Sequence, residues 1–394
     1  MALTLAMDER DPGSLGAASR LRSRVSPELA ALALDQAALR LRARTKFGDD
    51  AAGLWFTATG LEQATRPEVS QWRAETFGRG MTRVVDLGCG LGFDALAMGR
   101  AGLAVEAVER DELTAACAAR NLADVGGRVL VGDAERFDLT GEDATLVFVD
   151  PARRSSTGRS WRLEDLSPSW EFVMGLRERC TRLVVKLGPG IARNLLPDDA
   201  TRHWVSHEGT LVELCLSTAL GLSTDGLSSD RGLSSDGGLS TGESEGALDR
   251  AVVIRGGVRH ELVGRHEGRL PVAGVGEFVH EPDPAVIRGQ LYSEVVDGHN
   301  AWMVDHDVAY LSSDAPIDSP MLTSFRVLEV LPWSEKVLRG WCREHGIGTI
   351  EIKKRGLDLD PAELRRRLKL KGSASATVII TPTPAGARAL VCER

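Results

Sequence analysis

Residues 84–94 have the sequence VVDLGCGLGFD, in which an apolar run meets the alternating glycines Gly88, Gly90 and Gly92. The apolar run predicts a β-strand, and the glycines predict a loop whose backbone passes close to a ligand, since glycine has no Cβ. A helix that begins at Phe93 would direct its unpaired N–H groups at the same place. We therefore predict a nucleotide-cofactor loop.

The residues around this loop narrow the choice of cofactor. A dinucleotide-binding fingerprint would have glycine or alanine at position 93, so Phe93 argues against NAD and FAD. A P-loop would carry Gly-Lys followed by Ser or Thr, which this stretch lacks, so ATP is also disfavoured.

Three more apolar runs end on an acidic residue. Residues 104–109 end on Glu109, residues 129–133 on Asp133, and residues 146–150 on Asp150. Together with the glycine loop, these ordered strand ends resemble the class I S-adenosylmethionine-dependent methyltransferases. The resemblance implies a doubly wound, Rossmann-like α/β sheet; the alternative is a sheet of this kind that binds no cofactor.

The resemblance also implies roles for individual residues. Glu109 would accept both ribose hydroxyls of S-adenosylmethionine, and Asp133 would accept the adenine amino group. The cofactor contacts implied in this way come from Asp86, Gly88, Cys89, Gly90, Gly92, Glu109, Arg110, Asp133 and Ala134.

The fourth strand end departs from the pattern of amino-methylating members. Those enzymes carry Asp or Asn, then Pro-Pro and an aromatic residue, whereas this chain has Asp150-Pro151-Ala152-Arg153-Arg154. The form with two arginines resembles a bacterial family of methyltransferases with a THUMP-like domain. Asp150 is our candidate for the group that accepts the substrate amine. The arginines would clamp a phosphate or stack on a base, or else face solvent.

A fifth strand is predicted at residues 183–187, before the turn Gly188-Pro189-Gly190. Its carboxyl end would lie at the same sheet edge as Asp150, so Lys186 is either a neighbour of the reacting group or a structural lysine. The candidate catalytic residues are Asp150, Pro151, Arg153 and Lys186.

Length and composition limit the remaining possibilities. A chain of 394 residues exceeds one ordinary core, and the formal net charge of -8 gives no global attraction to nucleic acid. The 6 cysteines form no CxxC pair, and no apolar run reaches the length of a membrane span. We therefore expect a cytoplasmic protein with reduced cysteines, with no membrane partner and no bound metal.

The residue pattern divides the chain into four segments, and the resemblance implies the identity of the last two. We expect a disordered tail at 1–19, a helical lead-in at 20–80, a methyltransferase domain at 81–262 and a THUMP-like α+β domain at 263–394. In the lead-in, Ser26 and Pro27 begin a helix that runs to about Lys46. The resemblance to the THUMP-like family implies that residues 62–66 form part of a lid over the cofactor; the alternative is a helical support under the sheet.

The methyltransferase domain contains a Gly/Ser/Asp repeat at 221–248, which we expect to be a disordered insertion because it has little apolar surface to bury. Residues 250–255 would form a hairpin with the strand at 210–219. In the last domain, strands and helices alternate from Phe325 in the order βαβαββ, and a capping box at Asp360 begins a helix that ends at Gly372.

A basic cluster lies at residues 353–371, where eight cations against three acids give a net charge of +5. Segregated positive charge is typical of phosphate-backbone contacts, although an arginine-rich helix can also be a solvated face. The predicted nucleic-acid contacts are Lys353, Lys354, Arg355, Arg365, Arg366, Arg367 and Lys369.

We therefore predict a methyltransferase that uses S-adenosylmethionine and acts on RNA, such as tRNA or rRNA, at a base amine or a ring nitrogen. One alternative is a small-molecule or protein methyltransferase. The other is an RNA-binding protein that retains the fold without catalysis.

Overall fold

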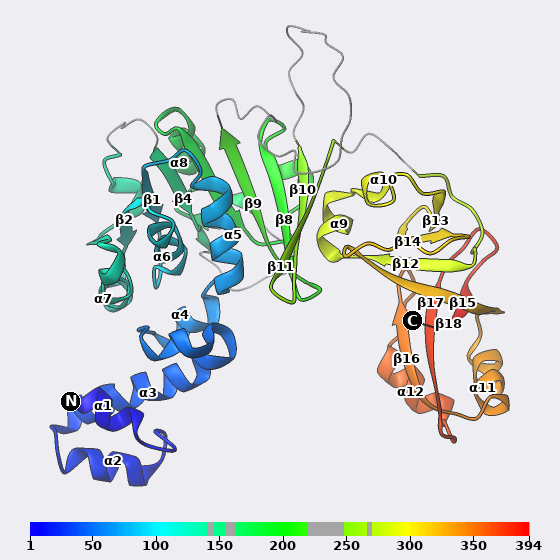
Figure 1. Cartoon of the computed structure of the whole chain (residues 1–394), viewed down its shortest axis with the longest axis horizontal. Coiled ribbons are helices and arrows are strands. Elements are labelled where there is room, and N and C mark those ends of the chain that lie inside the picture. The colour runs from blue at the N-terminus through cyan, green and yellow to red at the C-terminus, as the bar shows by residue number, and fades with distance from the viewer. Residues whose placement is uncertain (140–144, 154–161, 220–247, 266–269, 394) are drawn as a thin grey trace, which may run out of the picture. The chain divides into compact units, whose positions relative to one another are not determined.

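The computed structural model describes residues 1–139, 145–153, 162–219, 248–265 and 270–393 (Figure 1). The chain forms two compact units. Unit 1 runs from Met1 to Thr201 and resumes at Glu213, and unit 2 contains Arg202–Val212 and the chain from Ala247 to Arg394. The repeat insertion predicted at 221–248 lies outside the described residues except for Leu248. The domain boundary predicted after residue 262 stays a prediction.

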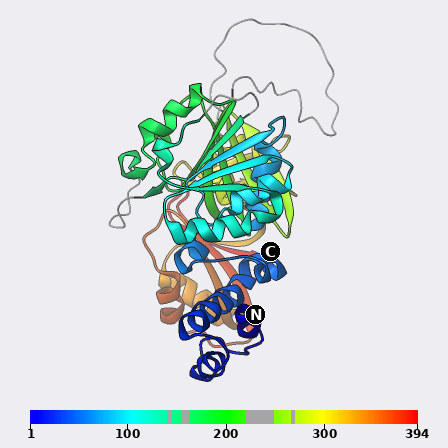
Figure 2. The same cartoon turned by 90° about the vertical axis from the view of Figure 1, so that its left-hand side faces the viewer.

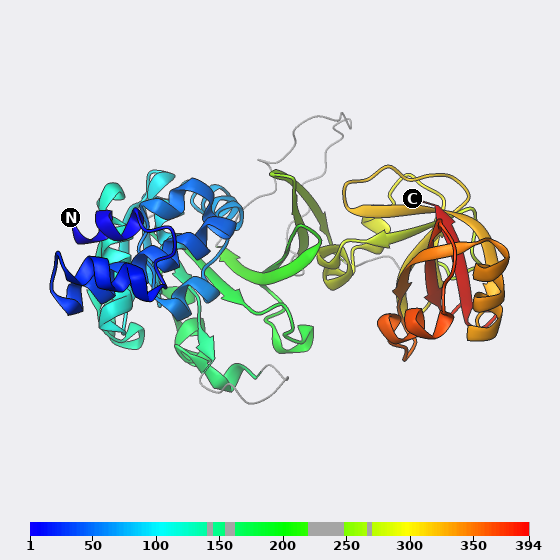
Figure 3. The same ribbon diagram turned by 90° about the horizontal axis from the view of Figure 1, so that it is seen from below.

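The N-terminal residues are helical, so the disordered tail expected at 1–19 is wrong. Helices α1 (Ala2–Met7) and α2 (Leu15–Arg22) pack on α3 (Pro27–Phe47), as Figure 3 shows. Their contact is made mostly by small side chains, among them the fully buried Ala6 and Ala17. Alanines let helices approach closely with little apolar bulk, which is why this segment has no strong hydrophobic pattern.

The predicted start of α3 is confirmed: the Ser26 side chain accepts a hydrogen bond from the Leu29 N–H, and Pro27 occupies the first turn. Three short elements follow before the first strand. They are the 3-10 turn η1 (Gly48–Ala52), α4 (Ala58–Gln63) and α5 (Pro67–Phe77).

Unit 1 is built on a twisted sheet with helices on both sides (Figure 2). Its strands lie in the order β9-β7-β4-β1-β2-β3 and are parallel, except that β9 runs antiparallel to β7. Their bounds are Arg83–Leu87 for β1, Ala104–Glu109 for β2, Arg128–Val131 for β3, Thr145–Val149 for β4, Arg182–Leu187 for β7 and Thr210–Ala219 for β9. The predicted doubly wound sheet is thereby confirmed. Strands β1 and β4 are buried almost throughout, as expected for central parallel strands.

The connections of unit 1 place helices and short ribbons at the ends of these strands. The helices are α6 (Phe93–Arg100), α7 (Glu112–Asn121) and α8 (Trp170–Gly175). Short 3-10 turns are η2 (Ala123–Val125), η3 (Ala134–Arg136), η4 (Leu163–Asp165), η5 (Leu176–Glu178) and η6 (Arg193–Leu195). After β4, residues Ala152–Arg153 (β5) pair with Leu166–Ser167 (β6).

Unit 2 contains all of β8 (Thr201–His207) after its first residue, together with β10 (Asp249–Arg255) and β11 (Val258–Gly264). The hairpin expected between residues 210–219 and 250–255 is wrong, because β10 pairs instead with β11 and, in parallel, with β8. Gly256 and Gly257 join β10 to β11 with φ angles of 56° and 75°. Two consecutive glycines with positive φ favour a tight hairpin, and this local signal outweighs pairing with the earlier strand.

The rest of unit 2 is a second sheet with strand order β13-β14-β12-β15-β18-β17-β16. The strands are β12 (Phe278–Pro282), β13 (Ala301–Asp305), β14 (Val308–Ser313), β15 (Leu322–Pro332), β16 (Ile347–Lys354), β17 (Ala374–Thr381) and β18 (Arg388–Glu393). The helices are α9 (Pro284–Gly289), α10 (Tyr292–Val295), α11 (Glu335–Glu344) and α12 (Pro361–Leu368). The predicted βαβαββ order from β15 to β18 is confirmed.

The last two helices pack on each other and on β16 (Figure 3). Leu338 of α11 and Leu364 of α12 are fully buried against Val378 and Ile380 of β17, while the intervening Ile379 belongs to a core cluster with Phe325 and Leu390. Alternating side chains of β17 thus serve opposite faces of the sheet.

The capping box of α12 is confirmed, since Asp360 accepts from the N–H groups of Ala362 and Glu363. The predicted end of this helix at Gly372 is wrong. The helix stops at Leu368 because Lys369 adopts a left-handed conformation with φ 51°.

We predict that Leu338→Ala lowers the free energy of unfolding by about 2–5 kcal/mol, because it leaves a cavity between α11 and the sheet. The neighbouring side chain Val337 is 39% exposed, so Val337→Ala is the matched control and should change stability by about 0.5 kcal/mol at most. Urea denaturation of both variants measures the difference. Equal losses would show that α11 does not pack as described.

Candidate active site

A cavity of about 1000 Å³ lies at the carboxyl ends of the parallel strands of unit 1. Strand order reverses here, because β1 lies between β4 and β2. In open α/β sheets this is where ligands bind. The sequence-predicted residues that line the cavity are Gly88, Cys89, Gly90, Glu109, Arg110, Asp133, Ala134, Asp150 and Lys186.

The glycine loop is tied to the neighbouring strand, since the N–H groups of Gly88 and Cys89 both donate to the Val108 carbonyl. Gly88, Gly90 and Gly92 have φ angles of 87°, 55° and 77°, which other residues rarely adopt. A Cβ at Gly90 would meet nothing within 4 Å, whereas one at Gly92 would lie 3.3 Å from the Leu122 side chain. The backbone of Gly90 is therefore accessible from the cavity, whereas Gly92 allows the loop to pack closely on Leu122.

Glu109, at the end of β2, is held by backbone donors. Its Oε2 accepts from the Gly90 N–H at 3.0 Å and its Oε1 from the Asp111 N–H at 2.9 Å. Each carboxylate oxygen has a further lone pair, so Glu109 can still accept hydrogen bonds from a ligand. Asp133 is fixed similarly, because its Oδ1 accepts from the Glu135 N–H at 3.0 Å.

Asp150 and Lys186 form an ion pair at the other end of the cavity. Lys186 Nζ lies 2.6 Å from Asp150 Oδ2, and the Asp150 side chain remains 38% exposed. The sequence placed these residues at one sheet edge, and the structure brings them into direct contact. Burial raises the pKa of Asp150, while the Lys186 ammonium acts in the opposite direction.

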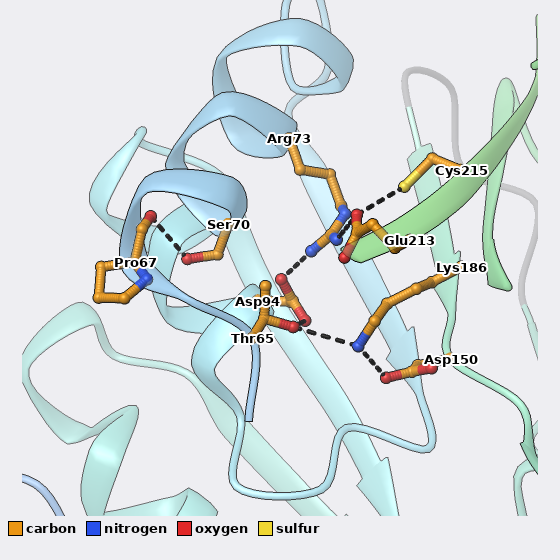
Figure 4. Close-up of polar contacts among 9 residues, drawn as sticks. All are labelled: Thr65, Pro67, Ser70, Arg73, Asp94, Asp150, Lys186, Glu213 and Cys215. Atoms are coloured by element: carbon orange, nitrogen blue, oxygen red, sulfur yellow. Dashed lines mark hydrogen bonds and ion pairs between the residues drawn. The ribbon is translucent and has the colours of Figure 1, made fainter. Parts of the chain in front are cut away.

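A charged network behind this pair was not predicted (Figure 4). Lys186 Nζ donates to Thr65 Oγ1 at 3.1 Å, and Thr65 Oγ1 donates to Asp94 Oδ2 at 2.8 Å. The fully buried Arg73 guanidinium pairs with both Asp94 and Glu213 and lies 4.9 Å from the Phe148 ring centroid. Each of these charges lies far from the others in sequence, so no local motif could reveal the network.

The segment before α5 lies over the cavity. Gln63, Ala64 and Thr65 line it, whereas Glu62 and Arg66 are exposed. This position supports the predicted lid. Asn121 holds the segment that leads to it. The Asn121 Oδ1 accepts from the Trp55 N–H, and its Nδ2 donates to the carbonyls of Trp55 and Leu91.

Three predicted residues, Asp86, Gly92 and Pro151, do not line the cavity. Asp86 is 1% exposed, its carboxylate has no hydrogen-bond partner among the described residues, and burial raises its pKa well above the usual value. Gly92 packs below the loop, and Pro151 is buried. Arg153 contributes its backbone to β5, and Arg154 lies outside the described residues.

The predicted basic residues of unit 2 differ in their surroundings. Lys353 and Arg355 both pair with Glu281, at 2.8 and 3.2 Å, and Arg367 pairs with Glu335 and Glu363, each at 3.0 Å. Lys354 and Arg365 bond to the carbonyls of Leu357 and Ile350. The exposed cations without an ion pair among the described residues include Arg366, Lys369 and Lys371.

Comparison with known proteins identifies the family. The chain is 33% identical over 344 residues to an uncharacterized S-adenosylmethionine-dependent methyltransferase of Mycobacterium tuberculosis, found in strains CDC 1551 and H37Rv, covering 84% of this chain and 87% of the relative. This chain belongs to the S-adenosylmethionine-dependent methyltransferases. The THUMP domain-like family matches residues 322–394, which places a THUMP-like domain at the C-terminus of this methyltransferase.

A solved structure supports the methyltransferase fold. A candidate methyltransferase of Porphyromonas gingivalis W83 aligns with a TM-score of 0.80 at 21% identity, covering 99% of this chain and 97% of that one. In the part of the chain that the structure describes, none of the helices has the length and apolarity that crossing a membrane requires.

The cavity of this methyltransferase suits S-adenosylmethionine. The open backbone at Gly90 leaves room beside the loop, and the fixed Glu109 carboxylate retains acceptors for two hydroxyl groups. The acidic side chains Glu109, Asp133 and Asp150 all line the cavity, which favours a ligand with positive charge.

We predict that Glu109→Ala weakens S-adenosylmethionine binding by about 1–3 kcal/mol, because two ribose hydroxyls lose a charged acceptor. Isothermal titration calorimetry measures this change. Glu112→Ala is the matched control, since Glu112 is an exposed acid three residues later. An unchanged affinity for Glu109→Ala would remove Glu109 from the cofactor site.

Proposed function

We propose that this methyltransferase modifies a base nitrogen of RNA, such as tRNA or rRNA. The observation that carries the proposal is the pairing of Asp150 with Lys186 inside the cofactor cavity of a chain that ends in a THUMP-like domain. An exposed carboxylate oxygen can accept the N–H of a nucleophilic nitrogen. The THUMP-like domain and its exposed cations supply a surface for phosphates.

S-adenosylmethionine supplies an electrophilic methyl group, so the protein has to orient a nucleophile rather than activate a leaving group. Glu109, Asp133 and the glycine loop would hold the cofactor at one end of the cavity. At the other end, Asp150 would orient the substrate nitrogen. Proximity and exclusion of water would then account for most of the rate enhancement.

The RNA surface we propose differs from the full basic cluster. Glu281 neutralises part of the charge of Lys353 and Arg355, and Arg367 is shared between two acids. Arg366, Lys369 and Lys371 are exposed at the end of α12 and just beyond it, so they can reach a phosphate without breaking an ion pair.

We also propose a cytoplasmic location. The six cysteines are all free, and reducing compartments keep thiols unpaired.

We predict that replacing Arg366, Lys369 and Lys371 by Ala weakens the binding of unrelated RNAs to a similar degree. The slope of log K against log salt should fall in magnitude by about 2 if all three contact phosphates. Filter binding of the full chain to two unrelated transcripts at several salt concentrations measures both effects. S-adenosylmethionine affinity should be retained.

The matched control replaces Arg10, Arg22 and Arg24, three exposed arginines of the N-terminal segment, by Ala. This control removes the same charge but should leave the salt slope unchanged. Equal slopes in the two triple variants would contradict a phosphate contact at α12. An unaltered protein with no salt-dependent RNA affinity would favour a small-molecule or protein substrate.

A further inference from the structure

The hydrogen bonds of Lys186 leave one donor for a substrate. An ammonium group has three N–H donors and no acceptor. Two of them are used, at 2.6 Å to Asp150 Oδ2 and at 3.1 Å to Thr65 Oγ1. Lys186 lines the cavity, and no third partner is found among the described residues. The remaining N–H is therefore available to a ligand.

The surrounding charges keep Lys186 protonated. Burial alone would lower its pKa, but the carboxylates of Asp150, Asp94 and Glu213 outweigh burial and hold the pKa above its ordinary value. Thr65 uses its own proton for Asp94, so it can only accept from Lys186. Lys186 consequently acts as a fixed cationic donor and not as a base.

Asp150 complements this donor with an acceptor. Its Oδ2 is taken by Lys186, while no hydrogen bond to Oδ1 is found among the described residues, and the side chain is 38% exposed. A substrate therefore meets one acceptor and one cationic donor side by side. The N2 amine of guanine lies between N1–H and the accepting ring nitrogen N3. Its N1–H side would place a donor against the ammonium, and its N3 side presents the same pattern as the edges of adenine and cytosine.

The positive charge of Lys186 has opposite effects on the two remaining kinds of base edge. Adenine and cytosine present an amine beside a ring nitrogen that accepts. A cation on that ring nitrogen draws electron density from the amine and weakens it as a nucleophile. Guanine N1 and uracil N3 present a ring N–H beside a carbonyl. A cation on that carbonyl oxygen stabilises the anion that forms when the N–H loses its proton, which strengthens the nucleophile.

We infer that the methylated atom is a ring nitrogen whose N–H lies beside a carbonyl, as in guanine N1 or uracil N3. This inference rests on the proposed RNA function. Asp150 Oδ1 takes the ring N–H proton, and Lys186 donates to the carbonyl oxygen. The ring nitrogen forms its bond to the methyl carbon as the carbon–sulfur bond breaks and its electron pair stays on sulfur. The proton then leaves Asp150 for solvent.

Mass spectrometry of nucleosides tests the inference on the unaltered protein. The full chain is incubated with S-adenosylmethionine bearing a deuterated methyl group and with total RNA from cells of the source organism that lack the gene. The expected label appears on 1-methylguanosine or 3-methyluridine. Label on N6-methyladenosine, N4-methylcytidine or N2-methylguanosine would overturn the inference and leave the RNA function intact. RNA without label would overturn both.

Lys186→Met provides the second readout, since it keeps an unbranched stem and removes the ammonium. The rate of methyl transfer should fall about 100-fold or more at neutral pH. The rate of the variant should then rise with pH as the substrate N–H ionises unaided, whereas the unaltered protein should already be at its plateau. A variant whose pH profile parallels that of the unaltered protein would contradict a role for Lys186 at the carbonyl.

Ser70→Ala is the matched control. Ser70 is buried on α5 close to the network, but its hydroxyl donates to the Pro67 carbonyl and to none of the charged groups (Figure 4). This variant should keep both the rate and the pH profile. S-adenosylmethionine affinity, measured by calorimetry, should change less than about threefold in both variants. The nucleoside identity is measured without any substitution, so it decides the question even where Lys186→Met is unstable.

Discussion

The burial of Arg73 is the constraint on which unit 1 depends. Its side chain has no exposure to solvent, and a buried cation is tolerated only with close anionic partners. Asp94 of α6 and Glu213 of β9 supply them, and the ring of Phe148 in β4 lies against the guanidinium. One side chain of α5 therefore ties together a helix and two strands next to the cavity. Removing either acid would leave an uncompensated charge in the core, which typically costs about 3–5 kcal/mol.

The pairing of Arg73 with two acids reduces the cost of burying these charges. The acids of the network outnumber its cations, so its net negative charge favours a positively charged ligand. Asp94 connects two parts of the network. One of its carboxylate oxygens pairs with Arg73, and the other accepts a hydrogen bond from Thr65. Through Thr65, the segment before α5 contacts Lys186 directly. A hydrogen bond therefore joins the segment over the cavity to the Asp150–Lys186 pair.

In unit 2, the folded structure shows that acids neutralise part of the basic cluster. Several cations that look available in the sequence belong to ion pairs that join β16 to β12 and α12 to α11. Partly exposed pairs of this kind contribute little stability but do reduce the charge that a phosphate would meet. Net charge over a stretch of sequence therefore overestimates the surface that can bind nucleic acid.

The sequence by itself determined the parallel strands, the glycine loop, the acids at the strand ends and the capped helix at Asp360. These features depend on hydrophobic periodicity, positive φ and local hydrogen bonds, all of which act within a few residues. It did not predict helices α1 and α2, since their alanine contacts leave no apolar pattern. The β10–β11 hairpin was also not predicted, although its Gly256-Gly257 turn is a local signal. Only the tertiary structure decided that Asp86 is buried away from the cavity, that Glu281 neutralises Lys353 and Arg355, and that Thr65, Arg73 and Glu213 support Lys186. Each of these depends on which distant charges meet in a low-dielectric interior, and burial is a property of the folded chain and not of any segment.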